Sequence, residues 1–111
     1  AYGSAENMAR LMSAAYRHAA RAFESTALPY AEFHNAAGKA YEAQNTNGIV
    51  DAIPGLVMGK TGYTDLAGGN LAVVFEKEPG HAVVVVVLGS TREGRFNDVL
   101  ELVEASIAET L

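Results

Sequence analysis

The sequence predicts an α/β fold in which an N-terminal and a C-terminal helix pack against an antiparallel sheet of three strands. Apolar residues recur at helical spacing near both ends of the chain, over residues 4–23 and from residue 92 onward. Between them, residues 56–88 contain three apolar segments separated by short turns, which join antiparallel neighbours. A chain of 111 residues, half of them hydrophobic, suits one small domain with a core.

The first helix is expected over residues 4–23. Ser4 suits the N-cap because its hydroxyl can accept a hydrogen bond from a free backbone N–H, and Glu6 suits the positive end of the helix dipole. Steps of three and four residues between apolar side chains predict one buried stripe, with the arginines of this stretch facing water. The stripe consists of Met8, Leu11, Met12, Ala15, Ala19, Ala22 and Phe23.

A small hairpin is expected next. Pro29 excludes a helix interior at its position because it lacks the backbone N–H that a helix requires. We expect a short strand over residues 28–33, a turn at 36–38 and a returning strand over 39–43. The loop at 45–48 is rich in Asn and Gly, which adopt left-handed backbone angles readily.

After one helical turn expected over residues 49–53, three strands follow with turn residues between them. Residues 83–87 are valine at every position, which is typical of a central strand covered on both faces. The strands are expected at 56–61, 71–76 and 81–88, with connections at 62–69 and 78–80.

The last helix is expected from residue 92 to the end of the chain. Together with the first helix it would cover the sheet and bury its apolar side chains. Its apolar stripe consists of Phe96, Val99, Leu100, Val103 and Ile107. Its solvent-facing side is expected to carry Asp98, Glu101 and Glu104.

Composition argues against several classes of function. The net charge is −5 and the eight Lys and Arg residues are scattered, so no basic surface is expected for nucleic acid. Without cysteine, the chain forms no disulfide and carries out no thiolate chemistry. His18, His34 and His81 have a spacing that suits no common metal site, so we expect neither a metal nor a cofactor.

Residues 55–61 are similar to a phosphate-binding loop, because two glycines are followed by Lys60 and Thr61. However, three residues separate Gly55 from Gly59, one fewer than that loop requires. The three are apolar and strand-like, and no helix pattern follows Thr61 to supply a positive dipole. A nucleotide site is therefore not expected.

The same stretch supports a second interpretation, the Lys-Thr-Gly motif of penicillin-binding proteins and serine β-lactamases. In that motif a substrate peptide lies along an exposed strand edge and hydrogen-bonds to its backbone. A cation and a hydroxyl at successive positions hold the carboxylate of the substrate, and a glycine leaves room for the acyl group. Lys60, Thr61 and Gly62 meet these demands in order.

Residues on both sides of the motif extend this likeness. They are Ser4–Ala9 with Leu11, Asn45–Asn47, Pro54–Gly55, Gly59–Asp65 with Ala67–Gly68, Val87–Gly89, and Arg95 with Asp98. Over nearly its whole length the chain thus resembles the D-alanyl-D-alanine carboxypeptidases, the low-molecular-mass penicillin-binding proteins. Asn7 is a departure, since Asp is more usual there. The resemblance implies a β-lactamase/transpeptidase-like fold, with residues 1–111 as the C-terminal portion of a single catalytic domain.

The resemblance implies roles for four consecutive positions. Lys60 and Thr61 would bind the terminal carboxylate region of the substrate, and Lys60 would also serve catalysis by shaping the field around the nucleophile. Gly62 would permit close approach of the substrate. The backbone N–H of Tyr63 would be one of two donors of the oxyanion hole.

Neighbouring polar residues are expected to have structural roles. Thr64 and Asp65 would fix the turn that follows the strand. Asn45 and Asn47 would bond the backbone of their own loop.

The nucleophile of that family lies outside the residues matched here. It belongs to a Ser-x-x-Lys motif, and a second motif is Ser-x-Asn; both precede the matched region. No serine of this chain begins either pattern. We therefore expect the full-length parent to be a serine-type D-Ala-D-Ala carboxypeptidase that acts on peptidoglycan pentapeptide stems through an acyl-serine and reacts with β-lactams. The chain alone is expected to be inactive.

Three alternatives stay open: a β-lactamase, an endopeptidase on the same fold, or a non-catalytic binding or assembly module. By resemblance, the setting is extracytoplasmic, in the periplasm or cell envelope. The sheet of the family has five strands, two of them from before the nucleophile, so the Val-rich strand should present an unpaired apolar edge here. We expect the N-terminal half of the same domain, or a second copy of this chain, to cover that edge.

Overall fold

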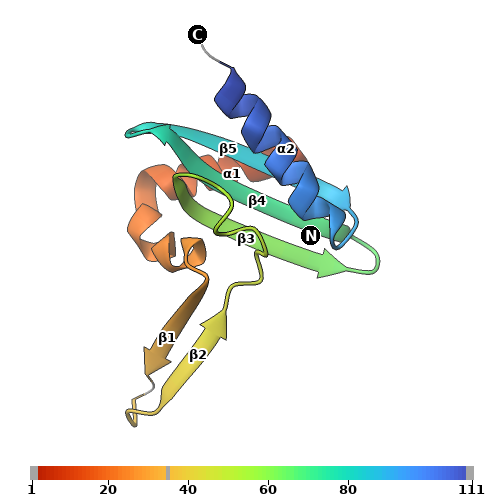
Figure 1. Ribbon diagram of the computed structural model, residues 1–111. Helices are drawn as coiled ribbons and strands as arrows, with labels where there is room; N and C mark the ends of the chain where they lie inside the picture. Colours follow the sequence, from red (N-terminus) through yellow and green to blue (C-terminus); the bar gives the residue numbers. More distant parts are fainter. Residues whose placement is uncertain (1–2, 35, 110–111) are drawn as a thin grey trace.

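The computed structural model describes residues 3–34 and 36–109, in which two helices enclose a three-stranded sheet and a two-stranded hairpin extends from one end (Figure 1). This arrangement confirms the predicted fold class. In chain order the elements are the α-helix α1 (Ala5–Ala19), the 3-10 helix η1 (Ala20–Ala27), the strands β1 (Tyr30–His34), β2 (Ala40–Gln44), β3 (Leu56–Thr64), β4 (Gly68–Glu78) and β5 (His81–Ser90), and the α-helix α2 (Gly94–Ala108).

The sheet has the strand order β3-β4-β5, and both pairs are antiparallel. Residues 71–75 of the central strand β4 are all buried. Successive strand residues point to opposite faces, so a strand buried at every position is covered on both sides. Leu71 and Val73 pack with α2, whereas Ala72 and Val74 pack with α1. The two helices therefore lie on opposite faces of the sheet.

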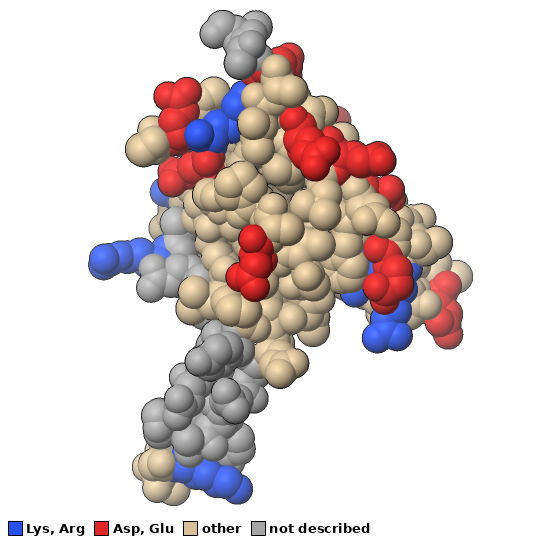
Figure 2. Space-filling view, in the orientation of Figure 1, with Lys and Arg blue, Asp and Glu red and all other residues tan. Residues whose placement is uncertain are grey.

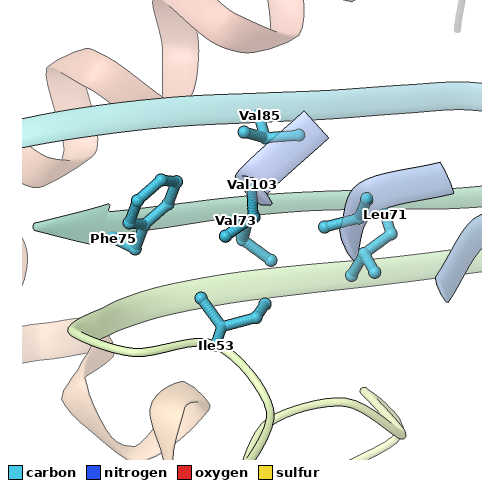
Figure 3. Close-up of a cluster of buried hydrophobic side chains, with 7 residues drawn as sticks. Ile53, Leu71, Val73, Phe75, Val85 and Val103 are labelled. Carbon is cyan, nitrogen blue, oxygen red and sulfur yellow. The ribbon is translucent and has the colours of Figure 1, made fainter. Parts of the chain in front are cut away.

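The larger hydrophobic cluster lies between the sheet and α2 (Figure 3). It consists of Ile53, Leu71, Val73, Phe75, Val85, Val99 and Val103. A smaller cluster under α1 consists of Met12, Met58, Ala72 and Val74. Because Phe75 is 0% exposed, its burial contributes about 1.5–3 kcal/mol to stability.

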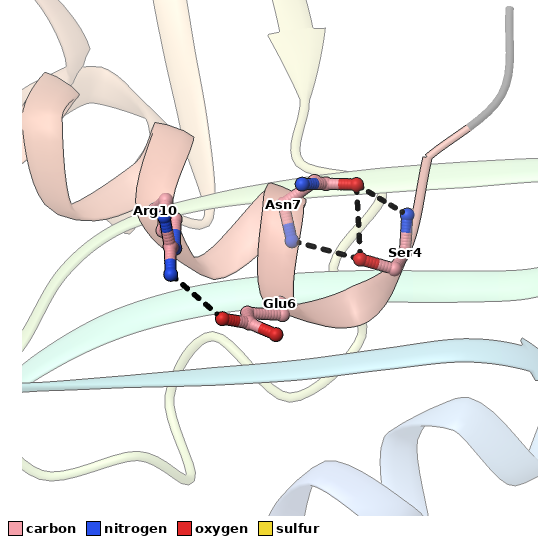
Figure 4. Close-up of polar contacts among 4 residues, drawn as sticks. All are labelled: Ser4, Glu6, Asn7 and Arg10. Carbon is pink, nitrogen blue, oxygen red and sulfur yellow. Dashed lines mark hydrogen bonds and ion pairs between the residues drawn. The ribbon is translucent and has the colours of Figure 1, made fainter.

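The start of α1 is fixed by a reciprocal cap (Figure 4). The Ser4 hydroxyl accepts a hydrogen bond from the Asn7 N–H at 3.1 Å, and the Asn7 side-chain oxygen accepts one from the Ser4 N–H at 3.1 Å. This is the capping-box arrangement with Asn in place of the usual Glu or Gln. The predicted N-cap is therefore confirmed, and Asn7 supplies the oxygen that the cap needs.

The first helix is shorter than predicted. The α-helix ends at Ala19, and the chain continues as the 3-10 helix η1 to Ala27. The Thr26 hydroxyl bonds the Phe23 carbonyl at 2.5 Å in this tighter segment. The stripe is also narrower than predicted, because Met12 is buried but Leu11 is 61% and Phe23 40% exposed.

The hairpin of β1 and β2 is confirmed, with strand ends shifted by one or two residues and Tyr30 paired with Gln44. The predicted loop at 45–48 is confirmed, although positive φ occurs at none of its four residues. Asparagine side chains shape the loop instead: Asn45 Oδ1 accepts the Asn47 N–H at 2.9 Å. A single turn follows, closed by the Ala52 N–H donating to the Ile49 carbonyl at 2.9 Å.

Both strands around the motif are longer than predicted. β3 continues through Gly62 to Thr64, and β4 begins at Gly68, so the connection is only residues 65–67. The glycines suggested a loop, but Gly62 pairs with Asn70 within the ladder. Only Gly68 of these has positive φ, at 76°.

The Val-rich strand β5 is not central, because β4 occupies that place and no described strand pairs with the other edge of β5. Its valines face helices on both sides, Val85 toward α2 and Val84 toward α1. Cover by a helix on each face is therefore enough for a strand to be apolar at every position, even at the edge of a sheet. The unpaired edge expected from the resemblance is present among the described residues.

α2 begins at Gly94, two residues later than predicted, and buries Val99 and Val103. The prediction that Asp98 faces solvent is wrong: it is half-buried and accepts a hydrogen bond from the Ser90 hydroxyl at 2.6 Å. Ile107, placed in the buried stripe, is 42% exposed. None of the three helices in the described residues has the length and apolar character needed to cross a membrane.

Candidate functional site

The Lys-Thr-Gly tripeptide lies on the outer strand of the sheet. β3 pairs with β4 on one side, and no described strand pairs with its other edge. The Gly59 N–H, which points to that free edge, donates to the Thr26 hydroxyl of η1 at 3.0 Å. Residues 61 and 63 repeat the orientation of Gly59, because backbone direction in a strand alternates with a period of two. Their N–H groups therefore point to the open edge.

Lys60 and Thr61 present their polar groups beside this edge. Lys60 is exposed, and its ammonium group contacts the Thr61 carbonyl oxygen. The Thr61 hydroxyl lies 2.5 Å from the hydroxyl of Thr46, which comes from the loop before β3. A cation and a hydroxyl pair thus stand next to each other, a combination that binds a carboxylate.

A hollow of about 530 Å³ opens between the start of α1 and the sheet. It brings Lys60, Thr61 and Gly62 together, whereas Tyr63 is not among its lining residues. The remaining lining comes from the N-terminal segment and α1 (Gly3, Ser4, Asn7, Met8, Leu11), from β4 (Asn70, Leu71, Ala72) and from β5 (Leu88). The tripeptide therefore faces a groove in the described molecule.

The peptide unit between Gly62 and Tyr63 is held from behind. The Gly62 carbonyl accepts hydrogen bonds from Arg95 Nη1 at 3.1 Å and from Asn70 Nδ2 at 3.4 Å. The chain has no cis peptide bond among its described residues, and the C=O and N–H of a trans peptide point in opposite directions. The Tyr63 N–H is therefore directed away from these two donors.

Asn70 and Arg95 are site residues for which the sequence predicted no role. Asn70 joins three strands, because its side chain also donates to the Gly68 carbonyl at 3.1 Å and accepts the Gly89 N–H at 2.9 Å. Arg95 is 6% exposed. A signal for it exists in the sequence: Arg95 stands one turn before Val99 and two before Val103, within the apolar stripe of α2.

The polar residues near the tripeptide have local partners. The Thr64 hydroxyl accepts the Ala67 N–H at 2.9 Å, which confirms that Thr64 fixes the turn. Asp65 accepts the Tyr63 hydroxyl at 3.2 Å. Asn45 Oδ1 accepts the Asn47 N–H at 2.9 Å and Asn47 Oδ1 accepts the Ile49 N–H at 3.2 Å, so both bond local backbone as predicted. Asn45 also donates to the carbonyls of Thr26 at 2.7 Å and Leu28 at 2.8 Å, outside this loop.

In the view of Figure 2, acidic side chains gather over α2, and Lys and Arg are scattered. Within residues 3–34 and 36–109, no group of three His, Cys, Asp or Glu could hold a metal ion. Ser4, which lines the hollow, uses its hydroxyl in the cap of α1.

The sequence matches the D-alanyl-D-alanine carboxypeptidase family, peptidase family S11, over residues 1–92. No curated protein matches the chain. Penicillin-binding protein D2 from Listeria monocytogenes, in its cefotaxime-bound form, is 32% identical with a TM-score of 0.71, and the match covers 85% of this chain and 36% of that one.

Two further structures share the fold. A mutant of the Streptomyces K15 DD-transpeptidase is 21% identical with a TM-score of 0.71, covering 94% of this chain and 43% of that one. The D-alanyl-D-alanine carboxypeptidase from Mycobacterium tuberculosis H37Rv is 23% identical with a TM-score of 0.68, covering 94% and 40%. The chain thus spans between 36% and 43% of the length of these structures. On the family match and the likeness to protein D2, the chain belongs to the D-alanyl-D-alanine carboxypeptidase family, within the penicillin-binding protein and transpeptidase fold.

Proposed function

We propose that this chain is the C-terminal part of the catalytic domain of a serine-type D-Ala-D-Ala carboxypeptidase and forms its substrate-binding strand. The observation that carries the proposal is the open edge of β3, on which Lys60, Thr61 and Gly62 line a hollow of about 530 Å³. An extended peptide adds to such an edge through backbone hydrogen bonds. The substrate is the D-Ala-D-Ala end of a peptidoglycan pentapeptide stem.

The four residues of the site have distinct roles in this proposal. The ammonium of Lys60 and the hydroxyl of Thr61 bind the terminal carboxylate, and the charge of Lys60 also acts on the nucleophile. Gly62 leaves space for the acyl group, since the nearest atom that a side chain there would meet is Asn70 Cβ at 3.9 Å. The Tyr63 N–H, which points to the free edge, donates to the oxyanion.

The reaction begins when a serine oxygen, supplied by the part of the domain before this chain, attacks the carbonyl carbon of the penultimate D-Ala. A C–O bond forms, and the carbonyl electron pair moves onto oxygen to give the oxyanion. When the carbonyl re-forms, the C–N bond breaks and the departing D-Ala amine takes the proton lost from the serine. Water then hydrolyses the acyl-serine ester.

The preceding part of the domain also completes the sheet in this proposal. The outer edge of β5 has no strand partner among the described residues, and Leu88 next to it is 39% exposed. An unpaired apolar edge favours the addition of another strand. The N-terminal half of the same domain supplies it, and a second copy of this chain is the alternative. Light scattering after size exclusion distinguishes them, and a clean monomer without a second polypeptide counts against both.

The ligands and the setting follow from the proposed activity. Protein D2 of Listeria monocytogenes has been seen in cefotaxime-bound and ampicillin-bound forms, which supports β-lactams as ligands of the parent. Because peptidoglycan lies outside the cytoplasmic membrane, we place the protein in the periplasm or cell envelope.

A fluorescent penicillin tests the proposal. The full-length parent should form a stable covalent adduct and release D-Ala from a D-Ala-D-Ala peptide, whereas the chain alone should do neither because it contains no Ser-x-x-Lys. An adduct on the isolated chain would refute the assignment of the nucleophile to another segment. Faster turnover of β-lactams than of peptide would make the parent a β-lactamase, and cleavage of a cross-linked peptide would make it an endopeptidase.

A non-catalytic binding or assembly module is the second candidate. These 111 residues contain neither Ser-x-x-Lys nor Ser-x-Asn, which is what a module without the chemistry would show. The coding sequence upstream of Ala1 decides between the two. A Ser-x-x-Lys there supports the enzyme, and its absence supports a module that keeps the strand without the chemistry.

A further inference from the structure

Arg95 is a buried cation in an electrostatically unfavourable place. It is 6% exposed, and it forms no ion pair with any carboxylate of the described residues. It also lies in the first turn of α2, where the helix dipole disfavours positive charge. Removing a cation from water costs several kcal/mol unless other groups compensate. Such a residue needs a specific reason for its position.

The compensating groups are backbone carbonyls of the substrate strand and its neighbour. Arg95 Nη1 donates to the Gly62 carbonyl at 3.1 Å and to the Asn70 carbonyl at 3.4 Å. The guanidinium carbon lies 4.7 Å from the centre of the Phe96 ring, which adds a cation–π contact. Its Nε has no partner among the described residues, so the environment satisfies the arginine only in part. The atom with two acceptors is Nη1, which meets Gly62.

The carbonyl that Arg95 contacts belongs to the same peptide unit as the Tyr63 N–H. The C–N bond of a peptide has partial double-bond character, so a cation at the oxygen draws electron density from the nitrogen. A hydrogen bond to the oxygen therefore makes the N–H at the other end a stronger donor, and bonds in a chain reinforce one another. Arg95 is on the α2 face of the sheet, behind the free edge at which the Tyr63 N–H points.

We propose that Arg95 is a positioning residue that polarises the Gly62–Tyr63 peptide and so strengthens the oxyanion hole from behind. This inference rests on the proposed function and deepens it. Arg95 does not touch the substrate. It acts through the peptide by fixing its orientation and by increasing the positive charge on the Tyr63 N–H, where negative charge develops in the transition state.

The test uses the full-length parent and the variants Arg95→Gln and Arg95→Lys. Arg95→Gln removes the charge, and Arg95→Lys keeps a charge on a shorter side chain. Val99→Ala is the matched control, because Val99 is 0% exposed one turn further along α2 and belongs to the hydrophobic core. The readouts are the rate constant of acylation at saturating β-lactam, the concentration for half-saturation, and the infrared carbonyl stretch of the acyl-serine ester.

Arg95→Gln should acylate about ten-fold more slowly, a fraction of the loss caused by deleting an oxyanion donor. Half-saturation should change little, because the interaction strengthens only in the transition state. The ester carbonyl stretch should move to higher wavenumber, since a weaker donor polarises the carbonyl less. Arg95→Lys should lie between Arg95→Gln and the wild type, and Val99→Ala should keep the wild-type wavenumber.

The outcomes separate this inference from the function on which it rests. If the wild-type parent is not acylated, the proposed function itself is wrong. If the wild type is acylated and both Arg95 variants keep its rate and carbonyl stretch, the function stands and the inference is wrong. Equal rate losses in Arg95→Gln and Val99→Ala with an unshifted stretch would likewise reduce Arg95 to a packing role. Should Arg95→Gln not fold, a slower Arg95→Lys variant with an unshifted stretch would equally overturn the inference.

Discussion

The Tyr16 hydroxyl donates a 2.6 Å hydrogen bond to Oε2 of Glu76 and so joins α1 to the end of β4. The same oxygen accepts the Gly80 N–H at 3.3 Å, in the turn between β4 and β5. The hydrogen bond to Glu76, together with burial and the negative charge of that carboxylate, raises the pKa of Tyr16 above its ordinary value of 10.0. A neutral tyrosine therefore holds the helix against the sheet.

Tyr16→Phe should change the response of stability to alkaline pH. A raised pKa in the folded state gives stability that is complete below the unfolded pKa of 10.0 and is lost as pH rises through the folded value. The variant lacks this alkaline loss, and at neutral pH it should be slightly less stable because one hydrogen bond is gone. Urea unfolding on both sides of pH 10.0 measures the two effects, and parallel curves for the two proteins would contradict the prediction.

Gly69→Ala should destabilise the fold strongly. A Cβ at this position would lie 2.1 Å from the Thr91 carbonyl oxygen, which is backbone and cannot rotate away. Overpacking of this kind costs about 3 kcal/mol. Urea unfolding should therefore give a markedly lower midpoint than for the wild type. Gly80→Ala is a useful comparison, since nothing lies within 4 Å there and its cost comes from the positive φ of 80° alone.

Gly62→Ala should separate folding from binding. The nearest atom to a Cβ there is Asn70 Cβ at 3.9 Å, and the φ of Gly62 is not positive, so the fold should accept alanine. The methyl group would instead project into the space that the proposed function assigns to the acyl group. Acylation of the full-length parent by a β-lactam should fall about a hundred-fold with an unchanged melting temperature. A large loss of stability would show that Gly62 is required for packing instead.

Ser4→Ala should destabilise α1 by about 1 kcal/mol, because the Asn7 N–H loses the hydroxyl that caps it. The neighbouring ion pair should matter less. Glu6 Oε1 lies 2.8 Å from Arg10 Nη2, but the two side chains are 73% and 78% exposed. Glu6→Gln should therefore lower the free energy of unfolding by at most about 0.5 kcal/mol. Urea unfolding of both variants compares the two losses of stability, and a larger loss for Glu6→Gln than for Ser4→Ala would contradict the prediction.

The elements of the fold were largely predictable from the spacing of apolar residues and from turn residues. The strand that was misplaced shows the limit of this method. The five valines of β5 indicate that both faces are covered, and the sequence alone does not distinguish cover by two helices from a place between two strands. The number of strand neighbours depends on contacts between distant residues, which local periodicity does not record.

Glycine misled the assignment of the strand ends for a related reason. Gly62 and Gly69 suggested a connection, although both belong to strands. Position 69 requires glycine because the Thr91 backbone lies against it. Local sequence does not reveal such a contact between residues far apart in the chain. In the site, the tripeptide was visible as a motif. Arg95 and Asn70 had no predicted role, because their effect depends on which carbonyl they reach.

The residues that lead into α2 pack directly against the backbone of β4. The Thr91 carbonyl fits against Gly69, which pairs with Tyr63, and the same oxygen accepts the Arg95 N–H at 3.1 Å. The Thr91 hydroxyl accepts the Gly94 N–H at 2.8 Å. Helix α2 and strand β4 therefore meet at Thr91 without an intervening side chain. Because Gly69 pairs with Tyr63, a change that displaces the start of α2 should also displace the end of β3 that carries the candidate site.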